Sequence, residues 1–177
     1  MVTTRVSVVL IDDNLVAREG IVALIRSQPG FQVLAASANI EDALQQVQET
    51  GPDLVLLNLR REGEDSLTMA GLLHGQAPAS RVIVMGLRPV REDVTSLIRA
   101  GVSGFIMAGA PFEVFLDTIH LVARGTQVLP EDLTASLFGQ LHGHQNRNRL
   151  LSKLEVNSRL EVAAFALSVP ATAAGPA

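Results

Sequence analysis

Short apolar runs alternate with amphipathic segments over about the first 125 residues, and this alternation constrains the fold more than any other feature. The apolar runs predict five strands, at Arg5–Ile11, Phe31–Ala36, Asp53–Asn58, Arg81–Met85 and Gly104–Met107. The amphipathic segments predict five helices, at Asn14–Ser27, Ile40–Glu49, Ser66–His74, Arg91–Ala100 and Pro111–Arg124. Strands and helices that alternate in this way form a parallel sheet with helices on both faces.

We therefore predict an α/β chain with a flavodoxin-like (βα)5 doubly wound parallel sheet, strand order 2-1-3-4-5, and a small C-terminal helical appendage. Right-handed crossovers leave few topologies, and this strand order suits a domain of this length. The composition agrees with the prediction. Apolar residues make up 47% of the chain, but there are six Phe and no Trp or Tyr, so the core must be mainly aliphatic.

Charge and composition also narrow the partners and the compartment. A net charge of −4 gives no general attraction to DNA or to an anionic membrane, so any nucleic-acid contact needs a local basic patch. The absence of cysteine excludes disulfides and zinc–thiolate sites, and fits a reducing compartment. The sequence has no apolar run of about 18 residues and no secretion signal. We expect a cytoplasmic protein without membrane contact.

Ligand chemistry in a sheet of this kind is found at the carboxyl ends of the strands. The first predicted strand ends beside Asp12 and Asp13. Two carboxylates at this edge can hold a hard cation such as Mg²⁺ through their oxygen atoms. They can equally form a solvated pair, in which one carboxylate caps the helix that follows. Their spacing leaves both interpretations open.

Four segments carry a resemblance to a known family. VVLIDDNLVAREGI resembles the opening of NarL/FixJ-type (LuxR-type) response regulators, in which an acidic pair follows the first strand. PDLVLLNLR resembles their third strand, which ends in the phospho-accepting Asp. RAGVSGFIMAGAP and IHLVARGTQVL resemble their fifth strand and fifth helix. The resemblance covers about Arg5–Leu137, and it implies a receiver domain that acts in two-component signalling and transcription regulation.

The resemblance also implies that the phosphoacceptor site is degenerate. Its positions here are the acidic pair, the acceptor, the hydroxyl, the aromatic switch and the lysine, occupied by Asp12 and Asp13, Asn58, Gly86, Phe105 and Ala108. Asn58 offers neither a carboxylate nucleophile nor a third acidic ligand for Mg²⁺. Gly86 lacks the hydroxyl, and Ala108 lacks the cation that would offset phosphoryl charge. We therefore predict that phosphoryl chemistry is lost, with no cofactor and at most weak Mg²⁺ binding at the acidic pair.

Two questions about this site stay open in the sequence. A shifted register would need another acceptor, but Asp53 comes too early in its strand, and the other acids, Glu62, Glu64 and Asp65, lie in the loop beyond. The acidic pair also lacks the family's lysine, so another cation has to balance it unless the pair is solvated. The candidates are Arg88, Arg60 and Arg61, which follow Gly86 and Asn58 in sequence. One of them would hold the receiver in a fixed state; alternatively, all three are solvated.

The C-terminal part follows a different pattern. We predict a receiver-like domain over 1–127, a linker and connecting helix over 128–145, a helix-turn-helix remnant over 146–168 and a disordered tail over 169–177. The remnant, NRLLSKLEVNSRLEVAAFAL, resembles the end of the family's output domain, whose first two helices have no counterpart here. Its basic residues, Arg147, Arg149, Lys153 and Arg159, are candidates for DNA or docking contacts. Four cations give weak, salt-sensitive DNA binding without sequence readout.

The apolar side chains of the remnant have to pack on the receiver or on another protein. In the receiver, the usual family surfaces lie on the fourth and fifth helices and include part of the set Val94, Leu97, Ile98, Phe112, Phe115 and Leu116. We expect a non-enzymatic, atypical response regulator: a phosphorylation-independent receiver that acts through protein–protein contacts. Its expected partner is a second copy or a related response regulator. The alternatives are a DNA-binding LuxR/NarL-type regulator that uses the C-terminal helices, and a phospho-accepting receiver.

Overall fold

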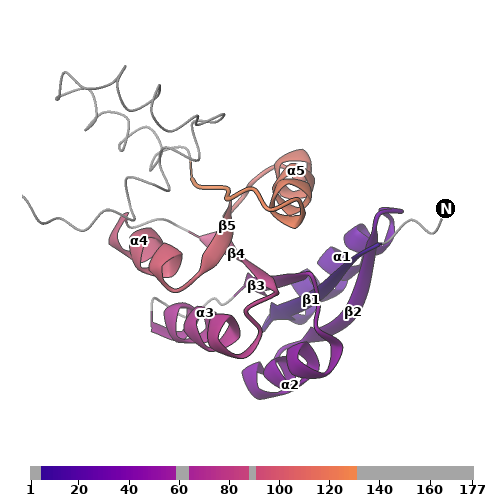
Figure 1. The fold of residues 1–177 in the computed structure, drawn as a ribbon. Coiled ribbons are helices and arrows are strands. Elements are labelled where there is room, and N and C mark those ends of the chain that lie inside the picture. The colour runs from indigo at the N-terminus through magenta and orange to yellow at the C-terminus, as the bar shows by residue number, and fades with distance from the viewer. Residues whose placement is uncertain (1–4, 59–63, 88–90, 131–177) are drawn as a thin grey trace, which may run out of the picture. The chain divides into compact units, whose positions relative to one another are not determined.

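A computed structural model describes residues 5–58, 64–87 and 91–130, in which five strands alternate with five helices (Figure 1). The strands are β1 (Val6–Asp12), β2 (Phe31–Ser37), β3 (Leu54–Asn58), β4 (Arg81–Leu87) and β5 (Val102–Met107). The helices are α1 (Leu15–Arg26), α2 (Ile40–Thr50), α3 (Glu64–Gln76), α4 (Arg91–Arg99) and α5 (Phe112–Ala123). All ten predicted elements are confirmed, with ends that differ by two residues at most.

The strands form one parallel sheet in the order β2-β1-β3-β4-β5, which confirms the predicted flavodoxin-like topology. The central pair, β1 and β3, is in register from Val8 with Leu54 to Asp12 with Asn58. Because both strands end at this pair, the two polar side chains lie next to each other at the carboxyl edge of the sheet. The register of β1 with β3 therefore places Asp12 beside Asn58.

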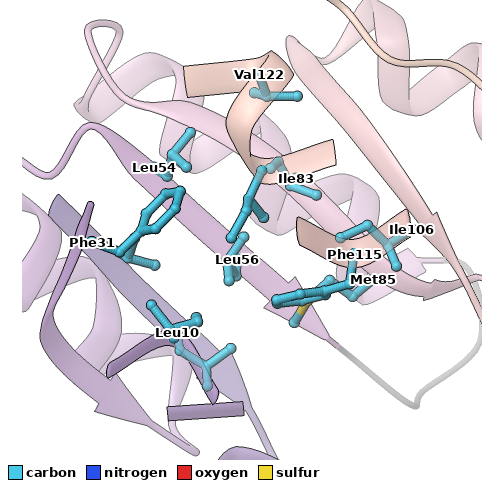
Figure 2. Close-up of a cluster of buried hydrophobic side chains, with 12 residues drawn as sticks. Leu10, Phe31, Leu54, Leu56, Ile83, Met85, Ile106, Phe115 and Val122 are labelled. Atoms are coloured by element: carbon cyan, nitrogen blue, oxygen red, sulfur yellow. The ribbon is translucent and has the colours of Figure 1, made fainter. Parts of the chain in front are cut away.

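Helices cover both faces of the sheet: α1 and α5 lie on one side, and α2, α3 and α4 on the other (Figure 1). The core under α1 and α5 is a cluster of buried aliphatic and aromatic side chains, of which Figure 2 labels nine. Strand residues alternate between the two faces. Leu10, Leu56 and Ile83 point into this cluster, and their equally buried neighbours face the other helices. Burial on both faces explains the continuous apolar runs in the sequence.

The chain after α5 returns to the edge of the sheet. The Val128 backbone N–H donates a hydrogen bond to the Ser103 carbonyl at 3.0 Å, and Val128 forms a single parallel bridge with Gly104. The compact receiver unit ends at Val128. The rest of the predicted linker, 131–145, the predicted remnant, 146–168, and the predicted tail, 169–177, lie outside the described residues. Within the described ranges, no helix is both long and apolar enough to cross a membrane.

Candidate functional site

Asp12, the last residue of β1, is the centre of the candidate site and has a solvent-exposed fraction of 0%. One carboxylate oxygen, Oδ1, accepts a hydrogen bond from the Asn14 backbone N–H at 2.8 Å. The other, Oδ2, accepts one from the Asn58 side-chain Nδ2 at 2.8 Å. Burying a carboxylate is costly unless its oxygens are hydrogen-bonded. Both oxygens of this buried carboxylate are therefore matched by neutral N–H donors.

Asn14 has a second role, because it is also the N-cap of α1. Its side-chain oxygen accepts a hydrogen bond from the Ala17 backbone N–H at 3.0 Å, as an N-cap residue does. The turn from β1 to α1 is thus fixed twice, once by the Asp12 carboxylate and once by the cap. The sequence predicted this helix start, and the structure confirms it.

Asn58 ends β3 and is half-buried. A carboxylate can only accept hydrogen bonds, so the Asn58 amide must turn its NH₂ group towards Asp12. Its oxygen then faces β4: a Cβ atom built on Gly86 would lie 2.6 Å from Asn58 Oδ1. Real Cβ atoms do not approach an oxygen so closely, so this position has room for glycine and no larger residue while the amide stays in place. The Asn58 side chain thus spans the gap between Asp12 and Gly86.

Gly86 has a left-handed backbone with φ of +73°. The register of β4 with β5 shifts at this point, since Met85 pairs with Ile106 and Leu87 with Met107, and Gly86 is left between them. A bulged residue with positive φ is a typical place for glycine. The structure therefore gives a backbone reason for the missing hydroxyl: a Ser or Thr at this position would be strained in this conformation.

The other three positions of the predicted site differ in their exposure to solvent. Asp13 is exposed. Ala108 follows β5 and is also exposed, and its backbone N–H donates to the Leu87 carbonyl at 3.0 Å. Phe105 is buried in the core, with an exposed fraction of 4%. Of the six predicted positions, Asp12, Asn58 and Gly86 are the three that the Asn58 side chain joins.

The structure adds one cation that the sequence analysis missed. The guanidinium Nη1 of Arg18, one turn into α1, donates a hydrogen bond to the backbone carbonyl of Asp12 at 2.7 Å. Arg18 therefore ties α1 to the end of β1, although its bond goes to the backbone and not to a carboxylate. The signal was present in the sequence, because Arg18 lies on the first helix shortly after the acidic pair. The three arginines predicted to enter the site, Arg60, Arg61 and Arg88, lie outside the described residues.

The donor groups at this edge do not fit a divalent cation. Mg²⁺ needs several oxygen ligands that are free to face it. Here both Asp12 oxygens face N–H donors, and Asn58 turns its NH₂ group to the same carboxylate. Across the part of the chain that the structure describes, no three His, Cys, Asp or Glu side chains gather closely enough to hold a metal. In this arrangement Asp12 and Asn58 bond to each other rather than face a shared cation.

The predicted docking residues on α4 and α5 differ widely in exposure. Val94, Leu97 and Phe115 are buried in the core, and Ile98 and Leu116 are half-buried. Phe112, at the start of α5, is 38% exposed and stacks on Phe115 with ring centroids 6.0 Å apart. Of the predicted set, Phe112 therefore offers the most surface to a partner. The exposed apolar surface of α5 also includes Val114 and Leu121, which the sequence analysis did not single out.

A family model described as the response regulator receiver domain matches residues 8–119, a span that includes the Asp12–Asn58–Gly86 contact. The chain belongs to this family. Its relatives include the nitrate/nitrite response regulator protein NarL of Escherichia coli (strain K12), which is 29% identical over 151 residues; the match covers 85% of this chain and 68% of NarL. The oxygen regulatory protein NreC of Staphylococcus aureus (strain JH9) is 27% identical over 158 residues, with coverages of 84% and 73%.

Solved structures show the same fold. A LuxR-family two-component response regulator from Aurantimonas sp. SI85-9A1 matches with a TM-score of 0.67 and 23% identity, over 73% of this chain and 92% of that chain. The receiver domain of a NarL regulator from Mycobacterium tuberculosis matches with a TM-score of 0.63 and 23% identity, over 69% and 98%. Together with the sequence relatives, these matches confirm the resemblance to NarL/LuxR-type response regulators.

Proposed function

We propose that this receiver works without phosphorylation, as an atypical response regulator that acts through protein–protein contacts in two-component signalling and transcription regulation. One observation carries the proposal. Where the family resemblance places the phospho-accepting carboxylate, Asn58 donates a hydrogen bond to Asp12 and turns its amide oxygen to Gly86. An amide oxygen is a poor nucleophile, and this one also faces a neighbouring strand.

The surroundings of Asn58 support the same conclusion. A phosphoryl group brings negative charge, which a receiver would have to offset with a cation and hydrogen-bond donors. The exposed methyl group of Ala108 supplies no charge, and Gly86 supplies no hydroxyl. With nucleophile, cation and hydroxyl all replaced, we propose that the chain is a non-enzymatic binding protein of the cytoplasm, without cofactor or membrane contact.

Intact mass spectrometry after incubation with acetyl phosphate and Mg²⁺ tests this proposal. We expect no phosphoryl adduct on the native chain. A variant with Asn58→Asp and Ala108→Lys restores the acceptor and the cation while it keeps Gly86, whose backbone does not suit a threonine. We expect this variant to gain a single adduct. An adduct on the native chain would instead support the alternative of a phospho-accepting receiver and defeat the proposal.

For the partner we propose a second copy of the chain or a related response regulator. The exposed apolar side chains of α5 support a contact surface: Phe112, Val114 and Leu121 have exposed fractions of 38%, 48% and 40%. Val114 and Leu121, seven residues apart, share one face of the helix, and an exposed apolar face is typical of a binding surface. If α5 carries the contact, light scattering with size exclusion will show a dimer that Val114→Glu dissociates. Leu72→Glu, a matched exposed change on α3, should leave the dimer intact.

A second candidate function is DNA binding by the C-terminal segment. The NarL match spans 151 residues, more than the 112 that the receiver model covers at 8–119, so it extends beyond the receiver. The candidate DNA contacts Arg147, Arg149, Lys153 and Arg159 all lie outside the described residues and remain a prediction. The division into linker, remnant and tail likewise remains part of the proposal.

Gel-shift titrations at two salt concentrations separate the two functions. Weak binding that is equal for a promoter fragment and a scrambled fragment, and that fades at physiological salt, agrees with contact to phosphates alone. Binding that selects the promoter fragment and survives that salt concentration would favour the DNA-binding regulator.

A further inference from the structure

The Asn58 amide can face Asp12 in two orientations, and each orientation suits a different interaction. With its NH₂ group forward, it donates a hydrogen bond to the carboxylate, as it does here at 2.8 Å. With its oxygen forward, it would instead present a second oxygen ligand beside Asp12, as a divalent cation requires. The same side chain cannot do both, because the two groups lie at opposite corners of one planar amide.

Gly86 influences which orientation is available. In the observed orientation Asn58 Oδ1 lies 2.6 Å from the point where a Cβ of residue 86 would be. A side chain there would require the end of the Asn58 side chain to shift from this position. Gly109 makes a useful contrast, because it has a similar backbone, with φ of +77° against +73°, but nothing lies within 4 Å of its Cβ position. A comparison of substitutions at Gly86 and Gly109 therefore separates the effect of the close Asn58 contact from the conformational cost of positive φ.

We infer that the Asn58 amide and a divalent cation compete for the Asp12 carboxylate. The space beside Gly86 accommodates the amide oxygen, so the NH₂ group of Asn58 can donate to Asp12. This hydrogen bond is favoured over the cation, and the receiver excludes Mg²⁺. The N–H of Asn58 supplies a partner to the buried carboxylate that is built into the fold and does not depend on cation concentration. The inference rests on the proposed function in one respect: both take Asp12 and Asn58 to be the altered phosphoacceptor site.

A Mg²⁺ titration of the native full-length chain, followed by NMR, is the first test. We expect the side-chain amide signals of Asn58 and the backbone signal of Asn14 to stay in place, because both groups remain hydrogen-bonded to Asp12. A saturable shift of these signals would show that the cation enters and would overturn the inference. This measurement needs no variant, so it does not depend on a substituted chain folding.

The second test compares melting temperatures in EDTA and in Mg²⁺. The native chain should melt at the same temperature in both. Asn58→Asp places two carboxylates together, so it should melt lower in EDTA and rise by about 5 °C when the cation is at about ten times its dissociation constant. Asn39→Asp is the matched control. Asn39 caps α2 by accepting from the Glu41 backbone N–H, so the change adds the same charge at an exposed asparagine away from Asp12. It should show no cation response.

If Asn58→Asp shows no response to Mg²⁺, something other than the amide excludes the cation, and the inference fails. Its failure is distinct from failure of the proposed function, which is judged by the phosphoryl adduct in the mass experiment. A native chain that binds Mg²⁺ without forming an adduct would overturn the inference alone.

The third test isolates the role of Gly86. Gly86→Ala and Gly109→Ala both force alanine into positive φ, but the first should lower the melting temperature by several degrees more, because it also displaces the Asn58 amide. In an Asn58→Ala background the two glycine changes should have equal effects. Equal effects in the native background would show that the Gly86 space is not needed for the hydrogen bond, and would overturn that part of the inference.

Discussion

The paired strands β1 and β3 carry a buried acid at one end and an exposed acid at the other, and the two are held differently. At the carboxyl edge, Asp12 is fully buried, and its partners are a backbone N–H and the Asn58 amide. At the amino edge, Asp53 is exposed, and its Oδ2 accepts from the Ser7 backbone N–H at 2.7 Å and from the Ser7 hydroxyl at 2.6 Å. Both contacts join the same two strands.

The amino edge favours the charged form of its acid. The Ser7 hydroxyl hydrogen bond, followed by the Ser7 N–H and the charge of Arg81, lowers the pKa of Asp53, although partial burial opposes the shift. The Ser7 hydroxyl also accepts from the Asp53 N–H at 2.9 Å, so the contact is reciprocal. The hydrogen bonds at the amino edge therefore hold β1 and β3 together. The carboxyl edge instead keeps a carboxylate buried where an apolar side chain would pack more simply, which is typical of a functional site.

The largest loss of stability is expected when the buried carboxylate of Asp12 is removed. Asp12→Ala leaves the Asn58 amide and the Asn14 N–H without their acceptor, so the free energy of unfolding should fall by about 2–4 kcal/mol. Urea denaturation at neutral pH measures it. Asp13→Ala removes the neighbouring exposed carboxylate and should change stability by less than about 0.5 kcal/mol. Equal losses of unfolding free energy in the two variants would show that the buried Asp12 contributes no more to stability than the exposed Asp13.

A smaller effect is expected at the exposed end. Ser7→Ala deletes the hydroxyl that both donates to and accepts from Asp53, but solvent can replace these bonds, so the loss should be about 1 kcal/mol. The same urea experiment applies. Ser27→Ala is a suitable control, because that hydroxyl makes only local bonds: it donates to the Leu24 carbonyl at the end of α1 and accepts from the Gln28 side-chain Nε2. A loss at Ser7 as large as that at Asp12 would contradict the comparison.

The smallest effect concerns pH. Because the folded pKa of Asp53 lies below its usual value of 3.8, its ionised form adds stability above that pH, and this contribution is lost as pH falls from 3.8 through the folded pKa. An NMR titration of the Asp53 carboxyl carbon should have its midpoint below 3.8 in the native chain. Ser7→Ala should move the midpoint upwards, since the leading cause of the shift is removed. An unchanged midpoint would assign the shift to the partners that remain, the Ser7 backbone N–H and Arg81.

The sequence predicted much of the fold because its signals are local. Each apolar run or amphipathic segment specifies one element, and the alternation of elements leaves few topologies. The start of the first helix at Asn14 was predicted for the same reason, since a helix start depends on residues within one turn. The candidate site was harder to predict. Phe105 and Ala108 were grouped with Asp12 by resemblance alone, and that grouping stays a prediction.

The sequence by itself determined which groups stand at the carboxyl edge: an acid, an amide in place of a second acid, and a glycine in place of a hydroxyl. The tertiary structure decided how they meet. The bond from Asn58 to Asp12 joins residues 46 positions apart, and it exists because β1 and β3 are in register at their last residues. In its observed orientation the amide oxygen faces the bulge at Gly86, on a third strand. Strand register and bulges are set by packing across the whole sheet, so local sequence patterns do not encode them.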